Sequence, residues 1–209
     1  MTDGGTGVDL FGNASEQKTL TAIQRIATRQ AVLPGRDLYT TEPKDIERFL
    51  SAIKRDGVEL PVPIWEPAAG RGDITKTLWK YNYKPIQSSD IYGYEDKDIR
   101  VVKKDFFTRK DAGPYKTIFT NPPFNAQEAF LEHALSMEVD VVFFVRLSFL
   151  SSIRRRGIYE KYNPACVYVY SARAHCYKDG DTAKGQNMID YCVMMWKPPY
   201  RNETKLRWI

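Results

Sequence analysis

The sequence predicts an α/β domain built on a mostly parallel sheet with helices on both faces. The chain has 209 residues and is 43 % hydrophobic, which suits one domain with a buried core. Short apolar runs alternate with amphipathic stretches along the chain, a pattern typical of strands linked by helical crossovers. We expect seven strands, the last two forming an antiparallel hairpin.

The expected elements follow from hydrophobic periodicity. Residues 1–17 mix Gly, Asp, Ser and Asn without periodicity and are expected to form a flexible arm. The remaining residues, 18–209, are expected to form a single domain. The expected helices are 18–30, 45–53, 73–81 and 126–137. The expected strands are 62–66, 85–90, 100–103, 117–120, 141–146, 166–171 and 189–196. A long polar loop, 173–187, is expected between the last two strands.

Composition excludes several classes of protein. No apolar run is long enough to cross a membrane, and the first residues do not resemble a signal peptide. Three cysteines without Cys-x-x-Cys spacing indicate a reduced, cytoplasmic protein. With only His133 and His175, we expect no zinc site. Residues 144–209 hold 12 Lys or Arg against 5 Asp or Glu, a balance that suits a polyanionic partner or merely a solvated surface.

A glycine-rich turn follows the first expected strand of the core. It reads Glu66-Pro67-Ala68-Ala69-Gly70-Arg71-Gly72 and leads into an expected helix. Glycines let a ligand approach the backbone closely, and a helix N-terminus favours a carboxylate. The third glycine of a dinucleotide-binding turn is absent, because Thr75 occupies its position.

Two further acids, Asp90 and Asp105, follow the next two expected strands. Ligands of open parallel sheets lie beyond the carboxyl ends of the strands, where a carboxylate commonly accepts from ribose hydroxyls. Either acid alone would more often be a loop residue or a helix cap. Their appearance at successive strand ends favours a nucleoside-binding edge.

The fourth of these strands leads into Asn121-Pro122-Pro123-Phe124. The lone pair of an adenine amino group is delocalised into the ring, so a catalyst must accept both amino hydrogens to make the nitrogen nucleophilic. The side-chain oxygen of Asn121 and the carbonyl of Pro122 suit that task, and Phe124 can stack on a base. A base in a duplex would have to flip out to reach them.

Taken together, these motifs resemble the S-adenosylmethionine-dependent amino-methyltransferases of the Asn-Pro-Pro-Tyr/Phe type, particularly small phage-type DNA N6-adenine methyltransferases. The resemblance covers about residues 36–197, including Tyr39-Thr40-Thr41, and implies a Rossmann-like class I fold in a bacterial or phage-infected cell. It implies that Asn121, Pro122, Pro123 and Phe124 are catalytic. It implies that S-adenosylmethionine, with S-adenosylhomocysteine as product, contacts Tyr39, Thr41, Glu66, Pro67, Ala68, Gly70, Gly72, Asp90, Ile91, Asp105, Phe106 and Asn121.

The expected reaction is methylation of adenine in DNA, without a separate target-recognition domain. We expect the nucleic acid to contact Arg146, Arg154, Arg155, Arg156, Arg173, Lys178 and Lys184. A methyltransferase acting on RNA or on a protein glutamine stays open, since those targets are also conjugated amines. The alternative of another class is an inactive nucleic-acid-binding or regulatory subunit. Ring-carbon methylation of cytosine is disfavoured, because no Pro-Cys pair supplies a nucleophile.

Overall fold

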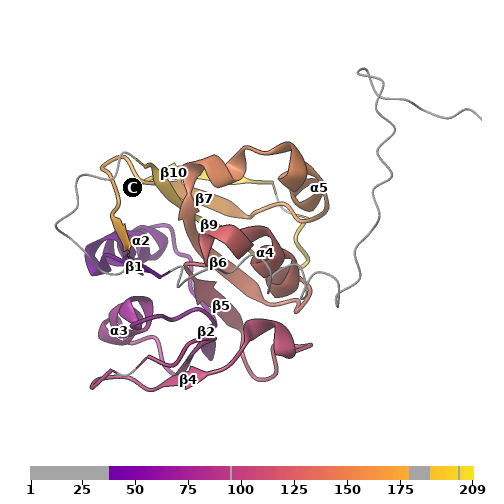
Figure 1. Ribbon diagram of the computed structural model, residues 1–209. Helices are drawn as coiled ribbons and strands as arrows, with labels where there is room; N and C mark the ends of the chain where they lie inside the picture. Colours follow the sequence, from indigo (N-terminus) through magenta and orange to yellow (C-terminus); the bar gives the residue numbers. More distant parts are fainter. Residues whose placement is uncertain (1–37, 95, 179–188, 202) are drawn as a thin grey trace, which may run out of the picture. The chain divides into compact units, whose positions relative to one another are not determined.

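The computed structural model describes residues 38–94, 96–178, 189–201 and 203–209. The expected arm 1–17, the expected helix 18–30 and residues 179–187 of the expected loop lie outside these residues. The described chain contains an eight-stranded sheet and a two-stranded sheet (Figure 1). None of its helices combines the length and apolar character that crossing a bilayer requires.

The large sheet has the strand order β10-β7-β9-β6-β5-β2-β3-β4. Its members are β2 (Ile64–Glu66), β3 (Ile86–Asp90), β4 (Val101–Lys103), β5 (Thr117–Thr120), β6 (Asp140–Arg146), β7 (Cys166–Val169), β9 (Tyr191–Trp196) and β10 (Lys205–Trp208). All neighbouring pairs are parallel except those of β9, which runs antiparallel to both β6 and β7. From β2 the chain proceeds to β3 and β4 on one side, then to β5 and β6 on the other. The boundary between β2 and β5 is therefore the point where ligands of such sheets bind.

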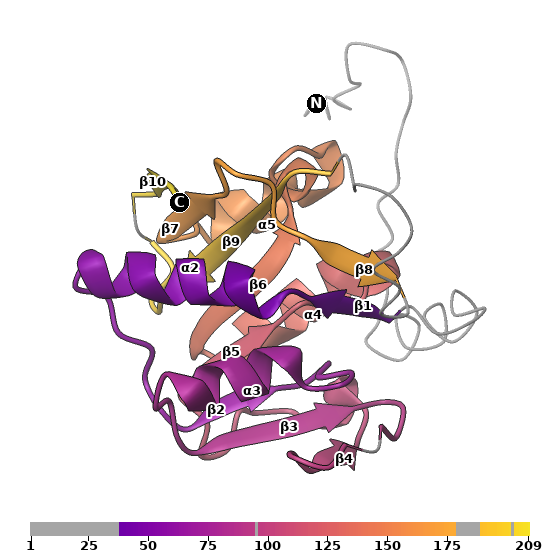
Figure 2. The same ribbon diagram turned by 90° about the vertical axis from the view of Figure 1, so that its left-hand side faces the viewer.

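Helices cover both faces of this sheet, as expected. In Figure 2, α2 (Pro43–Arg55) and α3 (Asp73–Lys80) lie in front of the sheet, and α4 (Gln127–Leu135) and α5 (Ile153–Lys161) lie behind it. The pleat of β6 separates the two cores: Val142 and Phe144 pack with α2 and α3, whereas Val141, Phe143 and Val145 pack with α4. This double burial explains why β6 is apolar at every interior position.

The predicted strands and helices of the core are confirmed, with ends that differ by a few residues. The expected strand count of seven is wrong, because β10 adds an eighth strand that pairs with β7. All four residues of β10 are exposed, so this edge strand lacks the apolar alternation that would have predicted it. Helix α5 was not among the expected elements.

The expected loop 173–187 is also corrected, because it contains a strand. Residues Cys176–Lys178 form β8, which pairs antiparallel with β1 (Tyr39–Thr41) in the small sheet. Each strand has only three residues and little apolar content, so neither shows a periodic pattern. The pairing joins segments far apart in the sequence, which local patterns cannot predict.

Candidate active site

The carboxyl ends of β2, β3, β4 and β5 meet at one edge of the large sheet. Glu66 and Asp90 are the last residues of β2 and β3, and Asp105 follows β4 by two residues. Asn121 follows β5 directly. The fold thus brings together the four polar positions that the sequence singled out.

The turn after β2 is shaped by two glycines with positive φ, 52° at Gly70 and 77° at Gly72. A Cβ on Gly70 would come within 2.7 Å of the Leu38 side chain, and one on Gly72 within 1.7 Å of Ile99. Neighbouring side chains therefore fill the space that both glycines leave. The two glycines let the chain turn and let neighbouring side chains pack closely against it. Nothing in the sequence indicated that Leu38 and Ile99 lie against this turn.

Glu66 lies beneath this turn and is 1 % exposed. Its Oε2 accepts hydrogen bonds from the backbone N–H and the hydroxyl of Thr75 in the first turn of α3, and the Thr75 hydroxyl also bonds Ser88. Burial raises the pKa of Glu66 to about 8, against the lowering effect of the Thr75 hydrogen bonds. The carboxyl therefore fixes the first turn of α3, which follows the glycine-rich turn, through its hydrogen bonds with Thr75.

Asp90 connects the end of β3 to the same turn. Its Oδ2 accepts from the Gly70 N–H at 2.9 Å, and its Oδ1 accepts from the Tyr92 N–H at 2.9 Å. Burial raises the pKa of Asp90, while these backbone hydrogen bonds lower it. A carboxylate has about four acceptor positions, so both oxygens keep capacity for a ligand's hydroxyl groups.

Asp105 and Phe106 have different surroundings, although they are adjacent. Asp105 is half-buried and caps the short 3-10 helix η1 (Phe106–Thr108), accepting from the Phe107 N–H at 3.1 Å. Phe106 is 1 % exposed and stacks on Phe130 with ring centroids 4.8 Å apart. This position argues against the expectation that Phe106 packs on a ligand's ring, because its faces are taken up in the core.

Asn121 is held by its amide nitrogen. Nδ2 donates to the Thr41 hydroxyl at 3.0 Å and to the Cys176 sulfur at 3.3 Å. The amide oxygen of Asn121 is buried and has no hydrogen-bond partner. Sequence reasoning missed Cys176, since a single cysteine in an expected loop gave no signal of proximity to Asn121.

Phe124 begins η2 (Phe124–Ala126) and lies among flat groups. Its ring centroid is 4.3 Å from that of Tyr39, and the Arg146 guanidinium carbon is 4.0 Å from it. Pro122 is buried, and the Pro123 carbonyl accepts from the Ala126 N–H at 2.9 Å. This hydrogen bond closes the turn that begins at Pro123.

No protein-family model matches the chain, and no curated protein matches it. Among solved structures, the Thermoplasma acidophilum protein 1320 aligns with a TM-score of 0.54 at 13 % identity, covering 83 % of this chain and 96 % of its own. A modification subunit of a putative type I restriction enzyme from Vibrio vulnificus aligns with a TM-score of 0.53 at 13 % identity, covering 88 % of this chain. This chain spans only 49 % of that subunit.

A putative class I S-adenosylmethionine-dependent methyltransferase from Listeria monocytogenes is also similar, with a TM-score of 0.48 at 12 % identity over 92 % of this chain and 75 % of its own. At such identities a likeness concerns architecture alone. The strand order of the large sheet and the helices between its strands are those of a Rossmann-like fold. In this fold the site described above lies at the expected place, beyond the carboxyl ends of the strands where their order reverses.

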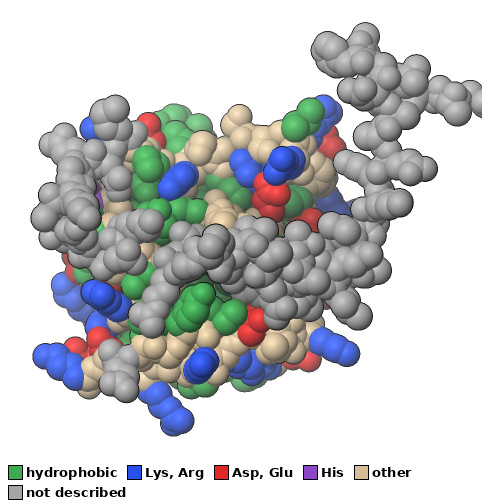
Figure 3. Space-filling model, in the orientation of Figure 1, with side chains coloured by type: hydrophobic (Ala, Val, Ile, Leu, Met, Phe, Trp, Pro, Cys, Tyr) green, Lys and Arg blue, Asp and Glu red, His purple; other side chains and the backbone are tan. Residues whose placement is uncertain are grey.

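The described residues that were expected to bind nucleic acid come from several elements, with three of them consecutive on α5. Arg146 ends β6 beside Phe124, and Arg154, Arg156 and Arg173 are exposed. Lys178 ends β8, and Lys184 lies outside the described residues. On the coloured part of the face in Figure 3, basic side chains are interspersed with acidic and apolar ones.

Arg155 differs from its two neighbours on α5. Its guanidinium donates to the backbone carbonyls of Phe149, Ser148 and Ser151 and to the carboxylate of Glu128. Only 15 % of its side chain is exposed. These contacts tie α5 to the preceding turn and to α4, so Arg155 is a structural residue rather than the expected phosphate contact.

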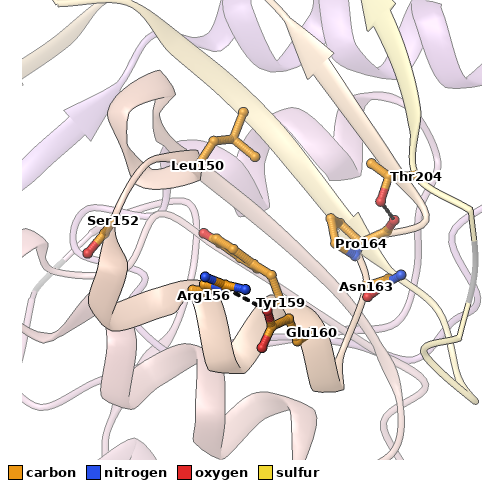
Figure 4. A pocket seen from close by; sticks show the side chains of 8 residues that line it. All are labelled: Leu150, Ser152, Arg156, Tyr159, Glu160, Asn163, Pro164 and Thr204. Atoms are coloured by element: carbon orange, nitrogen blue, oxygen red, sulfur yellow. Dashed lines mark hydrogen bonds and ion pairs between the residues drawn. The ribbon is translucent and has the colours of Figure 1, made fainter. Parts of the chain in front are cut away.

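Arg156 lines a shallow pocket of about 440 Å³ between α5 and the segment that precedes β10 (Figure 4). Its guanidinium pairs with Glu160, one turn further along α5, at 2.6 Å, and the Thr204 hydroxyl donates to the Pro164 carbonyl. None of the residues expected to bind a cofactor lines this pocket.

Proposed function

We propose that this protein is an S-adenosylmethionine-dependent methyltransferase that methylates an exocyclic amino group, with adenine in DNA as its favoured target. The observation that carries the proposal is the buried oxygen of Asn121, which has no partner although the nitrogen of the same amide has two. An unsatisfied buried polar atom costs about 1–3 kcal/mol. Such an atom at the ligand-binding edge of the sheet is expected where a ligand supplies the missing hydrogen bond.

The residues around this edge fit the cofactor. Asp90 offers two carboxylate oxygens with remaining acceptor capacity, which suits the two ribose hydroxyls. Asp105 would accept from the adenine amino group, while Phe106 supports it from the core. Glu66 would act on the cofactor through the turn 67–72, because its carboxyl is buried below that turn.

S-adenosylmethionine, held by Asp90 and Asp105, would supply an electrophilic methyl group for transfer to the amine. The contribution of this chain is to orient the amine. Asn121 Oδ1 and the Pro122 carbonyl would accept the two amino hydrogens and turn the nitrogen lone pair towards the methyl group. Acceptors held in place before the reaction stabilise the charge that develops on the nitrogen.

The target base would be held by stacking. Tyr39, Phe124 and Arg146 form a cluster of flat groups next to Asn121. Stacking on an aromatic side chain contributes about 1–3 kcal/mol per base. A flat heterocycle therefore fits this cluster better than an aliphatic amine does.

The preference for DNA is supported by charge and by fold. Residues 144–209 carry the excess of Lys and Arg, and Arg154, Arg156 and Arg173 are exposed. The Vibrio vulnificus protein of the same fold is described as the modification subunit of a putative restriction enzyme. These two observations favour DNA as the substrate that should be tested first.

The test is incubation of the protein with labelled S-adenosylmethionine and, in parallel, DNA, RNA and protein, followed by mass spectrometry of the nucleosides or peptides. We expect label in N6-methyladenine of DNA. Label found only in RNA, or only in glutamine of the protein, would show that this class of molecule is the substrate instead of DNA. Absence of cofactor binding in calorimetry would refute the proposal altogether.

Asn121→Ala is the variant that tests the mechanism. We expect its single-turnover transfer rate to fall by at least about 10²–10³, since a preorganised contact at the reacting centre is lost. Cofactor affinity should stay near that of the wild type, because Asn121 would contact the amine. Asn125→Ala, an exposed asparagine of the same turn, is the control. Transfer by Asn121→Ala at the wild-type rate would contradict the mechanism.

A further inference from the structure

Asn121 receives its two hydrogen-bond partners from two segments that are far from it and from each other in the sequence. Thr41 ends β1 and Cys176 begins β8, and the two residues face each other in the antiparallel register of the small sheet. Thr41 is 4 % exposed and Cys176 is fully buried. Their side chains converge on Asn121 Nδ2 at 3.0 Å and 3.3 Å.

The direction of an amide group decides what it can do. A side-chain amide presents two donors at its nitrogen and an acceptor at its oxygen. With both donors of Asn121 directed at Thr41 and Cys176, the oxygen must face the other way, and it is this atom that lacks a partner. An amide turned by 180° would present donors to an incoming amine, which needs acceptors.

The surroundings of Cys176 are consistent with an acceptor role for its sulfur. Tyr191 interacts with Cys176, and burial raises the pKa of Tyr191, so its hydroxyl stays protonated beside the thiol. The thiol is fully buried, so it lies out of reach of soluble oxidants and electrophiles. A buried thiol next to a polar amide fits a role in packing and weak hydrogen bonding.

We propose that Thr41 and Cys176 are positioning residues, which hold the amide of Asn121 so that its oxygen faces the target amine. This inference rests on the proposed methyltransferase function and assigns the β1–β8 sheet a part in it. It also gives Thr41 a different role from the expected contact with the cofactor. When the hydroxyl is removed, a positioning role predicts a slower transfer rate, whereas a cofactor contact predicts a weaker cofactor affinity.

The variants are Thr41→Val and Cys176→Ala, with Thr41→Ser as the conservative rescue and Cys192→Ala as the matched control. Cys192 is an equally buried cysteine on β9 that belongs to the other core cluster. Single-turnover transfer is measured with the substrate that the wild type methylates, alongside cofactor affinity by calorimetry. We expect Thr41→Val and Cys176→Ala to slow transfer by about tenfold to a hundredfold, because misplacement of a reacting group has effects of this size. Cofactor affinity should be unchanged, and Thr41→Ser should restore most of the rate.

A double-mutant cycle separates positioning from a general loss of structure. If Thr41 and Cys176 act through Asn121, removing either one from Asn121→Ala should cause no further loss of transfer. Equal losses in both backgrounds would overturn the proposal. So would a weakened cofactor affinity with an unchanged transfer rate, which is the result expected of a direct cofactor contact by Thr41.

A readout that does not depend on transfer keeps this inference distinct from the proposed function. In ¹⁵N-labelled protein, the side-chain amide signals of Asn121 are assigned by their loss in Asn121→Ala. Hydrogen exchange of these signals should accelerate by roughly tenfold in Thr41→Val and Cys176→Ala, and stay unchanged in Cys192→Ala. If the wild type methylates nothing, the proposed function is wrong. The exchange rates alone then decide whether Thr41 and Cys176 hold the Asn121 amide. Unchanged exchange in both variants would refute the proposal that Thr41 and Cys176 position Asn121.

Discussion

At the scale of single residues, Asp90 combines two tasks that the sequence could not separate. An acid at the end of β3 was expected to bind ribose hydroxyls, and the same carboxylate also holds the Gly70 and Tyr92 N–H groups. A ligand contact by Asp90 therefore depends on a carboxylate that is already fixed in direction. Fixed donors and acceptors bind ligands with less loss of entropy.

Asp90→Ala is expected to weaken cofactor binding by about tenfold to a hundredfold, since hydrogen bonds to a charged group contribute about 1.5–3 kcal/mol. Part of this loss would come from the freed Gly70 N–H, which loosens the turn. Calorimetry with S-adenosylhomocysteine measures the effect, and Asp98→Ala, an exposed acid after β3, is the control. Equal affinities of wild type and Asp90→Ala would remove Asp90 from the site.

Residue types were predictable at this scale, whereas side-chain directions were not. The sequence shows that Glu66 ends a strand and that Phe106 follows an acid. It does not show that Glu66 points below the turn towards Thr75, or that Phe106 packs on Phe130. Both directions depend on neighbours contributed by other elements, α3 and α4.

At the scale of elements, the three consecutive arginines of α5 divide into two kinds. Arg155 ties the helix to the turn before it and to α4, while Arg154 and Arg156 are exposed on the helix surface. Three neighbouring positions of a helix point in three directions, 100° apart, so one of them meets the protein. The sequence identified the cluster but not this division.

Arg155→Ala is expected to lower the free energy of unfolding by about 1–3 kcal/mol, because it breaks a hydrogen-bonded guanidinium contact and leaves carbonyls unpaired. Arg154→Ala combined with Arg156→Ala should leave stability nearly unchanged. This double variant should instead weaken DNA binding and reduce the salt dependence by up to about 0.9 logarithmic units of slope per lost phosphate contact. Urea unfolding and fluorescence anisotropy at several salt concentrations measure the two effects. An unstable double variant, or one with the wild-type salt slope, would contradict this division.

At the same scale, some strands could be predicted from sequence patterns and others could not. Strands β2, β5 and β6 were predictable because burial on both faces favours apolar residues at their interior positions. Strands β1, β8 and β10 have three or four residues each and lie in the small sheet or at an edge. The first two supply Thr41, which the sequence placed in the site in another role, and Cys176, which it missed; the pairing that brings both to Asn121 could not be predicted.

At the scale of the whole molecule, the buried carboxyl of Glu66 makes stability depend on pH. Burial raises its pKa to about 8 in the folded protein, against an ordinary value of 4.5. Between these values the folded state binds one proton more than the unfolded chain does. Stability contributed by this group is therefore present below pH 4.5 and is lost as the pH rises towards 8.

We expect the free energy of unfolding of Glu66→Gln to lack this dependence. The wild type should lose stability relative to the variant by up to about 1.4 kcal/mol per pH unit between pH 5 and 8. Urea unfolding at several pH values in this range gives the difference curve, in which the contributions of other acids cancel. A flat difference curve would show that Glu66 is ionised in the folded protein.

The small sheet affects the stage of synthesis at which the Asn121 amide gains both of its hydrogen-bond partners. Thr41 is synthesised early and Cys176 late, and the strands of the central sheet from β2 to β6 are made between them. A nascent chain can pair those strands before β8 has left the ribosome, and pairings between distant segments form slowly. Asn121 would then be in place, yet its amide would lack one of its two restraints until the final third of the chain arrives. Methyl transfer would therefore stay slow until synthesis has passed Cys176, which would limit modification of the target by truncated chains.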